Sequence, residues 1–299
     1  MLDQAERLRQ LFQERNLQTF SEDSESKDVF SSTVSKIITV TSGKGGVGKS
    51  NFVVNLGITL QKMGKSVLIF DADVGMGNDD VLMGFLPKYN VYDIIFNEME
   101  IEEVIIEGPY GIKLLPGGSG VNRIEEISEM QRERFLNKLG SLKEFDFILM
   151  DTGAGINKSV LGFIHCCDEL IIITTPEPTS LTDAYSLVKA VTHLRIKSTA
   201  KVIINRVMDY KEGQITFNKF NKATSKFLNI SMQYLGSIKE DRKLIQAVRQ
   251  QKPFVITYPD CEAAEDIRKV ALRLCGSNDG NKKKMGIQGL FKKIFNVFT

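Results

Sequence analysis

The sequence predicts an α/β fold in which helices flank a mostly parallel central sheet. Three observations point to this class. From residue 35 onward, short apolar runs alternate with longer segments of helical periodicity, which is typical of βαβ units. A glycine-rich loop separates the first apolar run from a helical stretch over residues 51–63. Two later apolar runs end in aspartate, and open parallel sheets bind their ligands beyond the carboxyl ends of the strands.

Buried strands are expected at short runs that are rich in aliphatic and β-branched residues. They cover residues 36–41, 66–71, 112–115, 146–151, 169–175 and 201–205. Since α/β folds of this size often form one unit, we assign residues 35–275 to a single domain.

The composition is that of an ordinary globular protein. Charged residues make up 25% of the 299 residues and the net charge is only +2, so nucleic acid is not an expected partner. The cysteines Cys166, Cys167, Cys261 and Cys275 match neither a disulfide framework nor a CxxC site, which indicates a reducing cytosol. No apolar stretch reaches the roughly 18 residues that a transmembrane helix needs. We therefore expect a cytoplasmic protein.

The residues before Ser35 are predicted to stand apart from the domain. Apolar residues at three- and four-residue spacing predict a helix over residues 3–15, within an N-terminal element of residues 1–20. Residues 21–34 follow as a polar, largely acidic run with little apolar surface to bury, which is typical of a flexible linker. A helix that packs on its own domain is the alternative.

A phosphate-binding loop lies between the first apolar run and the helix at 51–63. It matches the pattern G-x4-G-K-[ST] in the strand-to-helix context that this pattern requires. Its residues are Gly43, Lys44, Gly45, Gly46, Val47, Gly48, Lys49 and Ser50, and Asn51 follows them. The glycines allow close backbone approach, Lys49 would reach the β- and γ-phosphates, and Ser50 would ligate Mg²⁺. A loop that merely connects strand and helix would need neither side chain.

Aspartates at two further strand ends would complete a site for a magnesium–nucleotide complex. Asp71 and Asp73 end one apolar run, and their spacing directs both side chains to the same face of the strand. Asp151 ends another run, where Walker B geometry would let it hold a water of the Mg²⁺ ion, and Gly153 would let a backbone N–H approach the γ-phosphate. Asp71 is expected to support the same ion. An acidic pair at a strand end can also serve only as a turn former.

The second lysine of the loop, Lys44, is not required by ordinary phosphate-binding loops. With it, the loop resembles the deviant Walker A motif of the MinD/ParA superfamily of P-loop NTPases. The resemblance implies a Mg-dependent ATPase that forms a homodimer in its ATP state, in which Lys44 reaches the partner's nucleotide and acts with Lys49 in catalysis. It also implies that Asp73 orients the attacking water. A solvated loop lysine is the alternative for Lys44.

Two segments resemble the part of this superfamily that binds adenine. Asn205 and Arg206 follow one another at a strand end, and the resemblance assigns Asn205 to the base with Arg206 beside it. Residues 236–241 resemble a G-x-I-P-x-D sequence, but Lys239 stands where the family usually has proline. No N-K-x-D sequence typical of GTP binding is apparent nearby, so ATP is the expected nucleotide.

The N-terminal residues narrow the resemblance to one family. The sequence D-Q-A-E-R-L-R over residues 3–9 is similar to the opening of the FlhG family, also called YlxH or FleN, and residues 174–185 resemble the same family. The resemblance implies a regulator of flagellar number and placement whose N-terminal helix activates FlhF, a signal-recognition-particle-type GTPase. Asp3, Gln4 and Ala5 are the residues it assigns to this contact. Flagellar basal-body components remain open as further partners.

Residues 276–299 are predicted to form a basic linker and an amphipathic membrane-binding helix. Apolar residues gather on one side of this helix at Ile287, Leu290, Phe291, Ile294, Phe295 and Phe298. With lysines at 282–284 before it, the helix fits an interfacial anchor for anionic lipid, each lysine contributing about 1 kcal/mol. Two anchors in one ATP-bound dimer would add avidity, so nucleotide would control reversible peripheral binding to the cell membrane. The alternative is a last helix packed on the domain's own core.

Other functions on the same fold differ from this interpretation in their sequence features. A division-site MinD should lack the N-terminal helix. A ParA-like partitioning ATPase would bind DNA through a basic surface, whereas the tail here is apolar. Iron–sulfur carriers need cysteine pairs with a spacing that Cys166 and Cys167 do not have, and a metabolic ligase would require a further substrate motif.

Overall fold

The computed structural model describes residues 35–73, 79–118, 127–142, 145–276 and 286–298. At the centre of these residues is an eight-stranded sheet with the order β3-β4-β2-β5-β1-β6-β7-β8. Its strands are β1 (Lys36–Ser42), β2 (Val67–Ala72), β3 (Ile106–Glu107), β4 (Lys113–Leu115), β5 (Phe147–Ala154), β6 (Glu169–Thr174), β7 (Thr199–Val207) and β8 (Ser231–Lys239). Neighbouring strands are parallel except β3 and β4, which are antiparallel, so the predicted mostly parallel sheet is confirmed.

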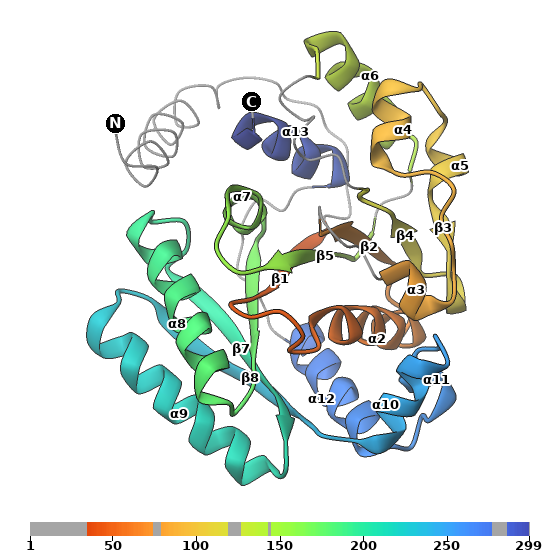
Figure 1. Cartoon of the computed structure of the whole chain (residues 1–299). Helices are drawn as coiled ribbons and strands as arrows, with labels where there is room; N and C mark the ends of the chain where they lie inside the picture. Colours follow the sequence, from red (N-terminus) through yellow and green to blue (C-terminus); the bar gives the residue numbers. More distant parts are fainter. Residues whose placement is uncertain (1–34, 74–78, 119–126, 143–144, 277–285, 299) are drawn as a thin grey trace.

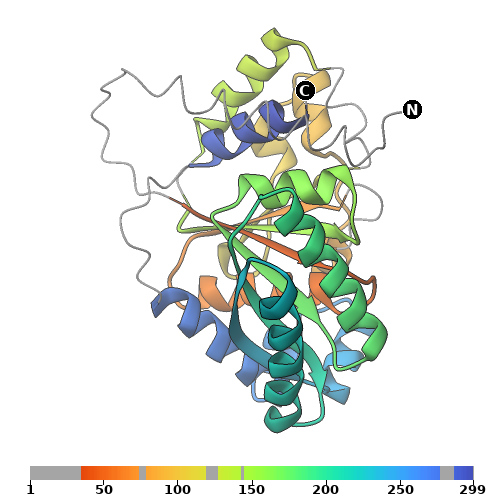
Figure 2. The same cartoon turned by 90° about the vertical axis from the view of Figure 1, so that its left-hand side faces the viewer.

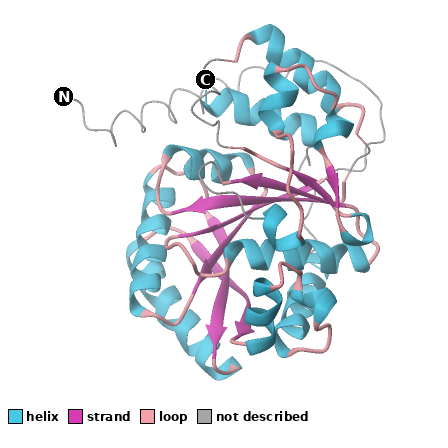
Figure 3. Ribbon diagram, turned by 45° about the vertical axis from the view of Figure 1, so that its right-hand side comes forward, coloured by secondary structure: helices cyan, strands magenta, loops and turns pink. Residues whose placement is uncertain are grey.

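Helices cover both faces of this sheet (Figures 1 and 3). They are α2 (Lys49–Lys62), α3 (Asp79–Met83), α4 (Val91–Phe96), α5 (Ile101–Val104), η1 (Pro109–Gly111), α6 (Glu129–Leu139), α7 (Lys158–Cys166), α8 (Pro178–His193), α9 (Tyr210–Phe227), α10 (Arg242–Arg249), α11 (Phe254–Thr257), α12 (Glu262–Gly276) and α13 (Ile287–Phe298). Helices α2 and α12 pack on one face, and α7 and α13 on the other. Because both faces are covered, a central strand such as β1 is buried along its whole length.

All the predicted strands exist, with somewhat shifted ends, whereas β3 and β8 were not predicted. Strand β8 pairs with β7 and forms the edge of the sheet. Its first residues alternate, with Ser231 and Gln233 exposed and Met232 buried. This half-buried pattern differs from the continuous apolar runs that mark the central strands, which is why a search for such runs misses it.

Several predictions concern residues outside the described part of the chain. These are the N-terminal helix with Asp3, Gln4 and Ala5, the linker over residues 21–34, and the lysines at 282–284. They stay predictions.

The C-terminal helix α13 packs its apolar side on the domain, between α6 and α7 (Figures 1 and 2). The ring of Phe291 lies 5.2 Å from that of Phe70 and 5.0 Å from that of Phe135, measured between centroids. The ring of Phe298 lies 5.5 Å from that of Phe163. We call the surface formed by Phe70, Phe135, Gly162 and Phe163 the α13 groove. The buried residues of α13 are Ile287, Leu290, Phe291, Ile294, Phe295 and Phe298.

These six residues are the ones predicted to enter a membrane. In this structure they are instead covered by the domain, because the aromatic groove between α6 and α7 matches the apolar stripe of the helix. The polar side, including Lys292 and Lys293, is exposed. Membrane binding stays a prediction, and it requires α13 to leave the groove. Within the described ranges, no helix has the length and apolar character that crossing a bilayer demands.

Candidate nucleotide-binding site

The predicted phosphate-binding loop joins β1 to α2, and its backbone requires glycine. Gly48 has a φ of 92° and precedes α2, a 14-residue helix without a side-chain N-cap. At Gly43 a Cβ would lie 2.2 Å from the backbone carbonyl carbon of Asp183 in α8, so no larger residue fits. The loop therefore leaves the positive end of a long helix open to an anion, which is how phosphate-binding loops work.

Lys49 reaches the carboxyl end of β5. Its Nζ donates to Asp151 Oδ1 at 2.9 Å, and both side chains are almost fully buried. Asp71 is the register partner of Asp151 in the parallel pair β2 and β5, which places both carboxylates on one face. The structure thus gathers the predicted phosphate-binding lysine and two predicted Mg²⁺ ligands in one cluster.

Burial and charge shift the pKa values in this cluster. Burial opposes protonation of Lys49, but the Asp151 carboxylate outweighs it, so the pKa of Lys49 is raised. Burial and the neighbouring Asp151 raise the pKa of Asp71 to about 7. The negative charge of Asp71 and Asp151 is therefore only partly compensated by the ammonium group of Lys49.

A cavity of about 1080 Å³ lies over the loop. Asp73 and Gly153 come together in its wall, since a Cβ on Gly153 would lie 3.2 Å from an Asp73 carboxylate oxygen. The predicted water-orienting aspartate is therefore beside the residue predicted to contact the γ-phosphate. The predicted residues that line this cavity are Gly45, Gly46, Gly48, Lys49, Ser50, Asn51, Asp73, Gly153 and Arg206.

The end of β7 holds the loop from the other side. Asn205 Nδ2 donates to the Val47 carbonyl at 2.7 Å, and Arg206 Nη2 donates to the Gly46 carbonyl at 2.7 Å. Arg206 has a φ of 56°, a left-handed conformation that is uncommon for a residue with a side chain and is often found at functional sites. Both residues also line a second cavity of about 450 Å³, which shares Gly48 and Asn51 with the first. The base of a nucleotide whose phosphates lie on the loop could occupy this second cavity.

The side chain of Lys44 does not lie with that of Lys49 at the strand ends. Its Nζ donates to Glu177 Oε2 at 3.0 Å and to Thr179 Oγ1 at 2.9 Å, and its side chain is 39% exposed. It is not among the residues that the structure places in the wall of the large cavity. Within one chain, Lys44 therefore lies beside the start of α8 rather than over its own phosphate site.

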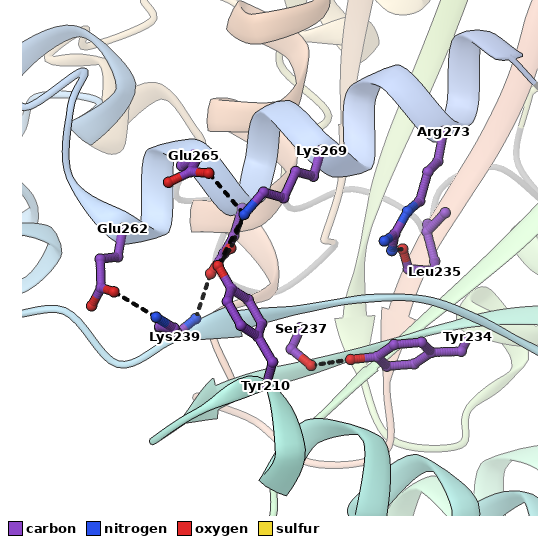
Figure 4. A network of polar contacts seen from close by, with 10 residues as sticks. Tyr210, Tyr234, Leu235, Ser237, Lys239, Glu262, Glu265, Lys269 and Arg273 are labelled. Atoms are coloured by element: carbon purple, nitrogen blue, oxygen red, sulfur yellow. Dashed lines mark hydrogen bonds and ion pairs between the residues drawn. The ribbon is translucent and has the colours of Figure 1, made fainter.

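Lys239, which replaces the usual proline, lies in a polar network between β8, α9 and α12 (Figure 4). Its backbone N–H donates to Asp266 Oδ2 at 3.1 Å, and Tyr210 donates to the other Asp266 oxygen at 2.6 Å. Its ammonium pairs with Glu262 and lies 4.4 Å from the Tyr210 ring centroid. Proline could make neither the N–H bond nor the cation–π contact, so this network replaces the rigidity of a proline at the wall of the second cavity.

The motifs did not include several residues that the structure brings to the site. Asn157, Val248, Arg249 and Gln251 line the large cavity from α10 and the loops before α7 and after α10. They come from segments far from the loop in sequence, and the sequence around them contains no motif that would predict nucleotide binding. Asp79 in α3 is fully buried near Lys49, and an acidic pair at residues 79–80 was the available signal for it.

The donor set at the strand ends suits magnesium. The Ser50 hydroxyl and the carboxylates of Asp71 and Asp151 are hard oxygen ligands of the kind that Mg²⁺ prefers. In the part of the chain that the structure describes, no group of three or more His, Cys, Asp or Glu side chains could hold a metal ion by itself. This fits Mg²⁺ in nucleotide sites, where phosphates and water supply most of the ligands.

Comparisons with known proteins agree with this site. A family model described as an AAA domain matches residues 35–204. The chain is 35% identical over 240 residues to the antiactivator FleN of Pseudomonas aeruginosa, covering 80% of this chain and 86% of FleN. It is 33% identical over 299 residues to the flagellum site-determining protein YlxH of Helicobacter pylori, covering 98% of each chain.

Solved structures share the fold. A chain of the MinC:MinD cell division protein complex of Aquifex aeolicus has a TM-score of 0.66 at 26% identity, covering 84% of this chain and 100% of that one. MinD of Pyrococcus horikoshii, solved with Mg-ADP, has a TM-score of 0.64 at 23% identity, covering 81% of this chain and 96% of that one. With FleN and YlxH both above 30% identity over most of their lengths, the chain belongs to the FlhG (FleN/YlxH) family of MinD/ParA-type ATPases.

Proposed function

We propose that this protein is an ATP-hydrolysing switch that dimerises with ATP, binds the membrane peripherally and regulates flagellar number or placement by stimulating the GTPase FlhF. The position of Asp73 against Gly153, on the cavity that the phosphate-binding loop lines, carries the ATPase part. The flagellar part is supported by the relatives, one named an antiactivator and the other a flagellum site-determining protein.

The predicted site residues have distinct proposed roles in hydrolysis. The loop N–H groups would hold the phosphates, and Lys49 would exchange its bond to Asp151 for a phosphate oxygen. Magnesium, held by Ser50, Asp71 and Asp151, would neutralise phosphate charge. The Asp73 carboxylate would accept a hydrogen bond from the attacking water and hold it in line with the γ-phosphate.

Asp73→Ala tests this assignment. The variant should bind ATP as the wild type does, because Asp73 belongs to neither the loop nor the expected Mg²⁺ ligands, but it should lose hydrolysis and accumulate as the ATP dimer. Fluorescent-nucleotide titration, phosphate release and size-exclusion chromatography with light scattering measure the three properties. Wild-type turnover in this variant would mean that another residue orients the water.

Lys44 is proposed to act on the nucleotide of the partner subunit. Its contacts with Glu177 and Thr179 lie beside the start of α8, so the lysine would exchange these partners for the partner subunit's phosphates when the dimer forms. A cation supplied in this way stabilises charge on the transferred phosphoryl group, as an arginine finger does.

Mixing two inactive variants separates action in trans from action in cis. Lys44→Ala and Asp73→Ala should each be inactive alone. In a mixed dimer, the site that retains Asp73 receives an intact Lys44 from the other subunit, so an equimolar mixture should recover about a quarter of wild-type turnover. A lysine that acts within its own subunit predicts no recovery at any mixing ratio.

Membrane binding is proposed to require release of α13 from the α13 groove in the ATP dimer. The six buried residues of α13 would then face lipid, with Lys292 and Lys293 at the headgroups. Sedimentation with anionic liposomes should show binding with ATP but not with ADP, and truncation after Asn281 should abolish it. Liposomes of neutral lipid serve as the control, and persistent binding of the truncated protein would contradict the anchor.

The proposed contact with FlhF is tested with a peptide of residues 1–20. The native peptide should raise the GTPase rate of purified FlhF, whereas Gln4→Ala should not. Loss of stimulation in the variant would assign Gln4 to this contact. If neither peptide stimulates FlhF, the flagellar assignment weakens and the ATPase assignment is unaffected.

A division-site role is the second candidate, since MinD structures share the fold and a septum site-determining MinD of Helicobacter pylori is 27% identical over 269 residues. The discriminating result is ATP-dependent membrane binding together with no effect of the N-terminal peptide on FlhF. A ParA-like role would instead be indicated by strong, salt-sensitive binding of the ATP dimer to DNA.

A further inference from the structure

A buried carboxylate without a hydrogen-bond donor lies beside the phosphate-binding lysine. Asp79 begins the short helix α3, and its side chain is 0% exposed. Neither of its carboxylate oxygens has a hydrogen-bond donor in bonding geometry among the described residues. The Asp151 carboxyl lies close to it, but two carboxylates can share a hydrogen bond only when one of them is protonated. Burying a carboxylate without compensation is strongly unfavourable, so a group of this kind needs a function or a ligand that explains it.

Asp79 belongs to the cluster at the ends of β2 and β5. Burial raises the pKa of Asp79, the carboxylates of Asp151 and Asp71 raise it further, and the Lys49 ammonium partly offsets the rise. Asp71 and Asp151 are themselves 6% and 1% exposed. The cluster therefore comprises four buried ionisable groups that come from β2, β5, α2 and α3.

The charges of this cluster do not balance. When all groups are ionised, the three buried carboxylates carry three negative charges against the single positive charge of Lys49, which leaves two negative charges uncompensated within the cluster, and the neighbouring Asp73 adds to this excess. A nucleotide alone cannot correct the imbalance, because it brings more negative charge and attracts Lys49 to its phosphates. A divalent cation would reduce this excess of negative charge, and Mg²⁺ prefers oxygen ligands.

Packing does not account for Asp79. Met83 of the same helix is buried in the apolar core on the α2 face, so α3 already has an apolar anchor. An apolar residue at position 79 would occupy a buried place without the cost of desolvating a carboxylate. A carboxylate at this position is explained if it interacts with an ion.

We propose that Asp79 is an additional positioning residue of the Mg²⁺–nucleotide site, where its carboxylate accepts hydrogen bonds from water molecules bound to the ion. The inference rests on the proposed nucleotide-binding function. Contact through water is the form that fits, because the described residues contain no three-carboxylate group able to hold a metal directly and Mg²⁺ usually keeps several of its waters.

The Mg²⁺ dependence of ATP binding tests the proposal. The affinity for a fluorescent ATP analogue is titrated against Mg²⁺, with EDTA as the metal-free point, for the wild type, Asp79→Asn, Asp79→Glu and Asp80→Asn. Asp80 is the matched control, since it is partly exposed and its Oδ1 accepts a hydrogen bond from the Val81 N–H. Thermal melting establishes that each variant is folded.

Asp79→Asn should keep the metal-free affinity and raise the Mg²⁺ concentration at the midpoint by about 10- to 100-fold, the usual effect of removing an outer-shell partner. Asp79→Glu, which keeps the carboxylate, should lie between Asn and the wild type, and Asp80→Asn should match the wild type. Direct Mn²⁺ binding, followed by electron paramagnetic resonance in the presence of ATP, should show the same order.

Two results would overturn the proposal. One is an unchanged Mg²⁺ midpoint in Asp79→Asn. The other is an equal loss of ATP affinity with and without Mg²⁺, which would make Asp79 a structural residue of α3. A wild type that does not bind the ATP analogue would instead refute the proposed function, so the two failures are distinguishable.

Discussion

The nucleotide cavity has a volume of about 1080 Å³ and charged side chains in its wall, whereas the α13 groove is aromatic and is filled by α13. Phe70 and Asp71 are consecutive in β2, yet Phe70 contacts Phe291 of α13 while Asp71 faces Asp151 in the charged cluster. Adjacent residues of a strand point to opposite faces of the sheet, so one strand end supplies both regions. This strand end therefore combines a buried aromatic contact that stabilises the fold with a buried carboxylate that destabilises it until a ligand binds.

This difference predicts that substitutions in the groove reduce stability, whereas those in the cavity reduce activity. Phe291→Ala should have the largest effect, because the ring is 3% exposed and contacts Phe70, Phe135 and Phe295. We expect its free energy of unfolding to fall by about 3–5 kcal/mol, measured by urea denaturation, with unchanged ATP affinity in the folded protein.

The exposed neighbour Lys292 is the matched control for Phe291. Lys292→Ala should change the free energy of unfolding by less than about 0.5 kcal/mol, as surface substitutions usually do. If both variants had the same stability, α13 would not occupy the groove in solution.

Gly162→Ala should have an intermediate effect. A Cβ at this position in α7 would lie 2.4 Å from a ring carbon of Phe298, so α13 or α7 must shift. We expect a loss of about 1–3 kcal/mol, the usual cost of overpacking. The same unfolding measurement on Phe298→Ala and on the double variant supplies the control. Since Phe298→Ala removes the clash, the two losses should add up to more than the loss in the double variant.

Lys44→Ala should have a small effect on stability and a large one on turnover. The Lys44–Glu177 pair is well exposed, so its removal should change the free energy of unfolding by less than about 1 kcal/mol. Phosphate release, in contrast, should be lost if Lys44 serves the partner subunit. A variant with wild-type turnover would mean that Lys44 is a solvated loop residue. Substitution at this position would then reduce neither stability nor activity.

Local patterns were sufficient where the relevant residues are contiguous. The loop from Gly43 to Ser50 combines tight turns, a lysine and a helix start within a few residues, and the structure places it between β1 and α2 as predicted. Asp71, Asp73 and Asp151 were found because strand ends converge at one edge of a parallel sheet. Strand β8 was missed because its half-buried pattern at the sheet edge is weaker than that of a central strand.

By itself, the sequence determined six of the eight strands in the described sheet, the phosphate-binding loop and the amphipathic character of residues 287–298, since each depends on spacing along the chain. The tertiary structure alone decided that Lys44 bonds to Glu177, that Asp79 lies buried beside Lys49, and that the apolar side of α13 lies in the aromatic groove. The physical reason is that periodicity identifies an apolar face but not the surface that covers it. That surface is formed by Phe70, Phe135 and Phe163, which lie far apart in the sequence and meet only in the folded chain.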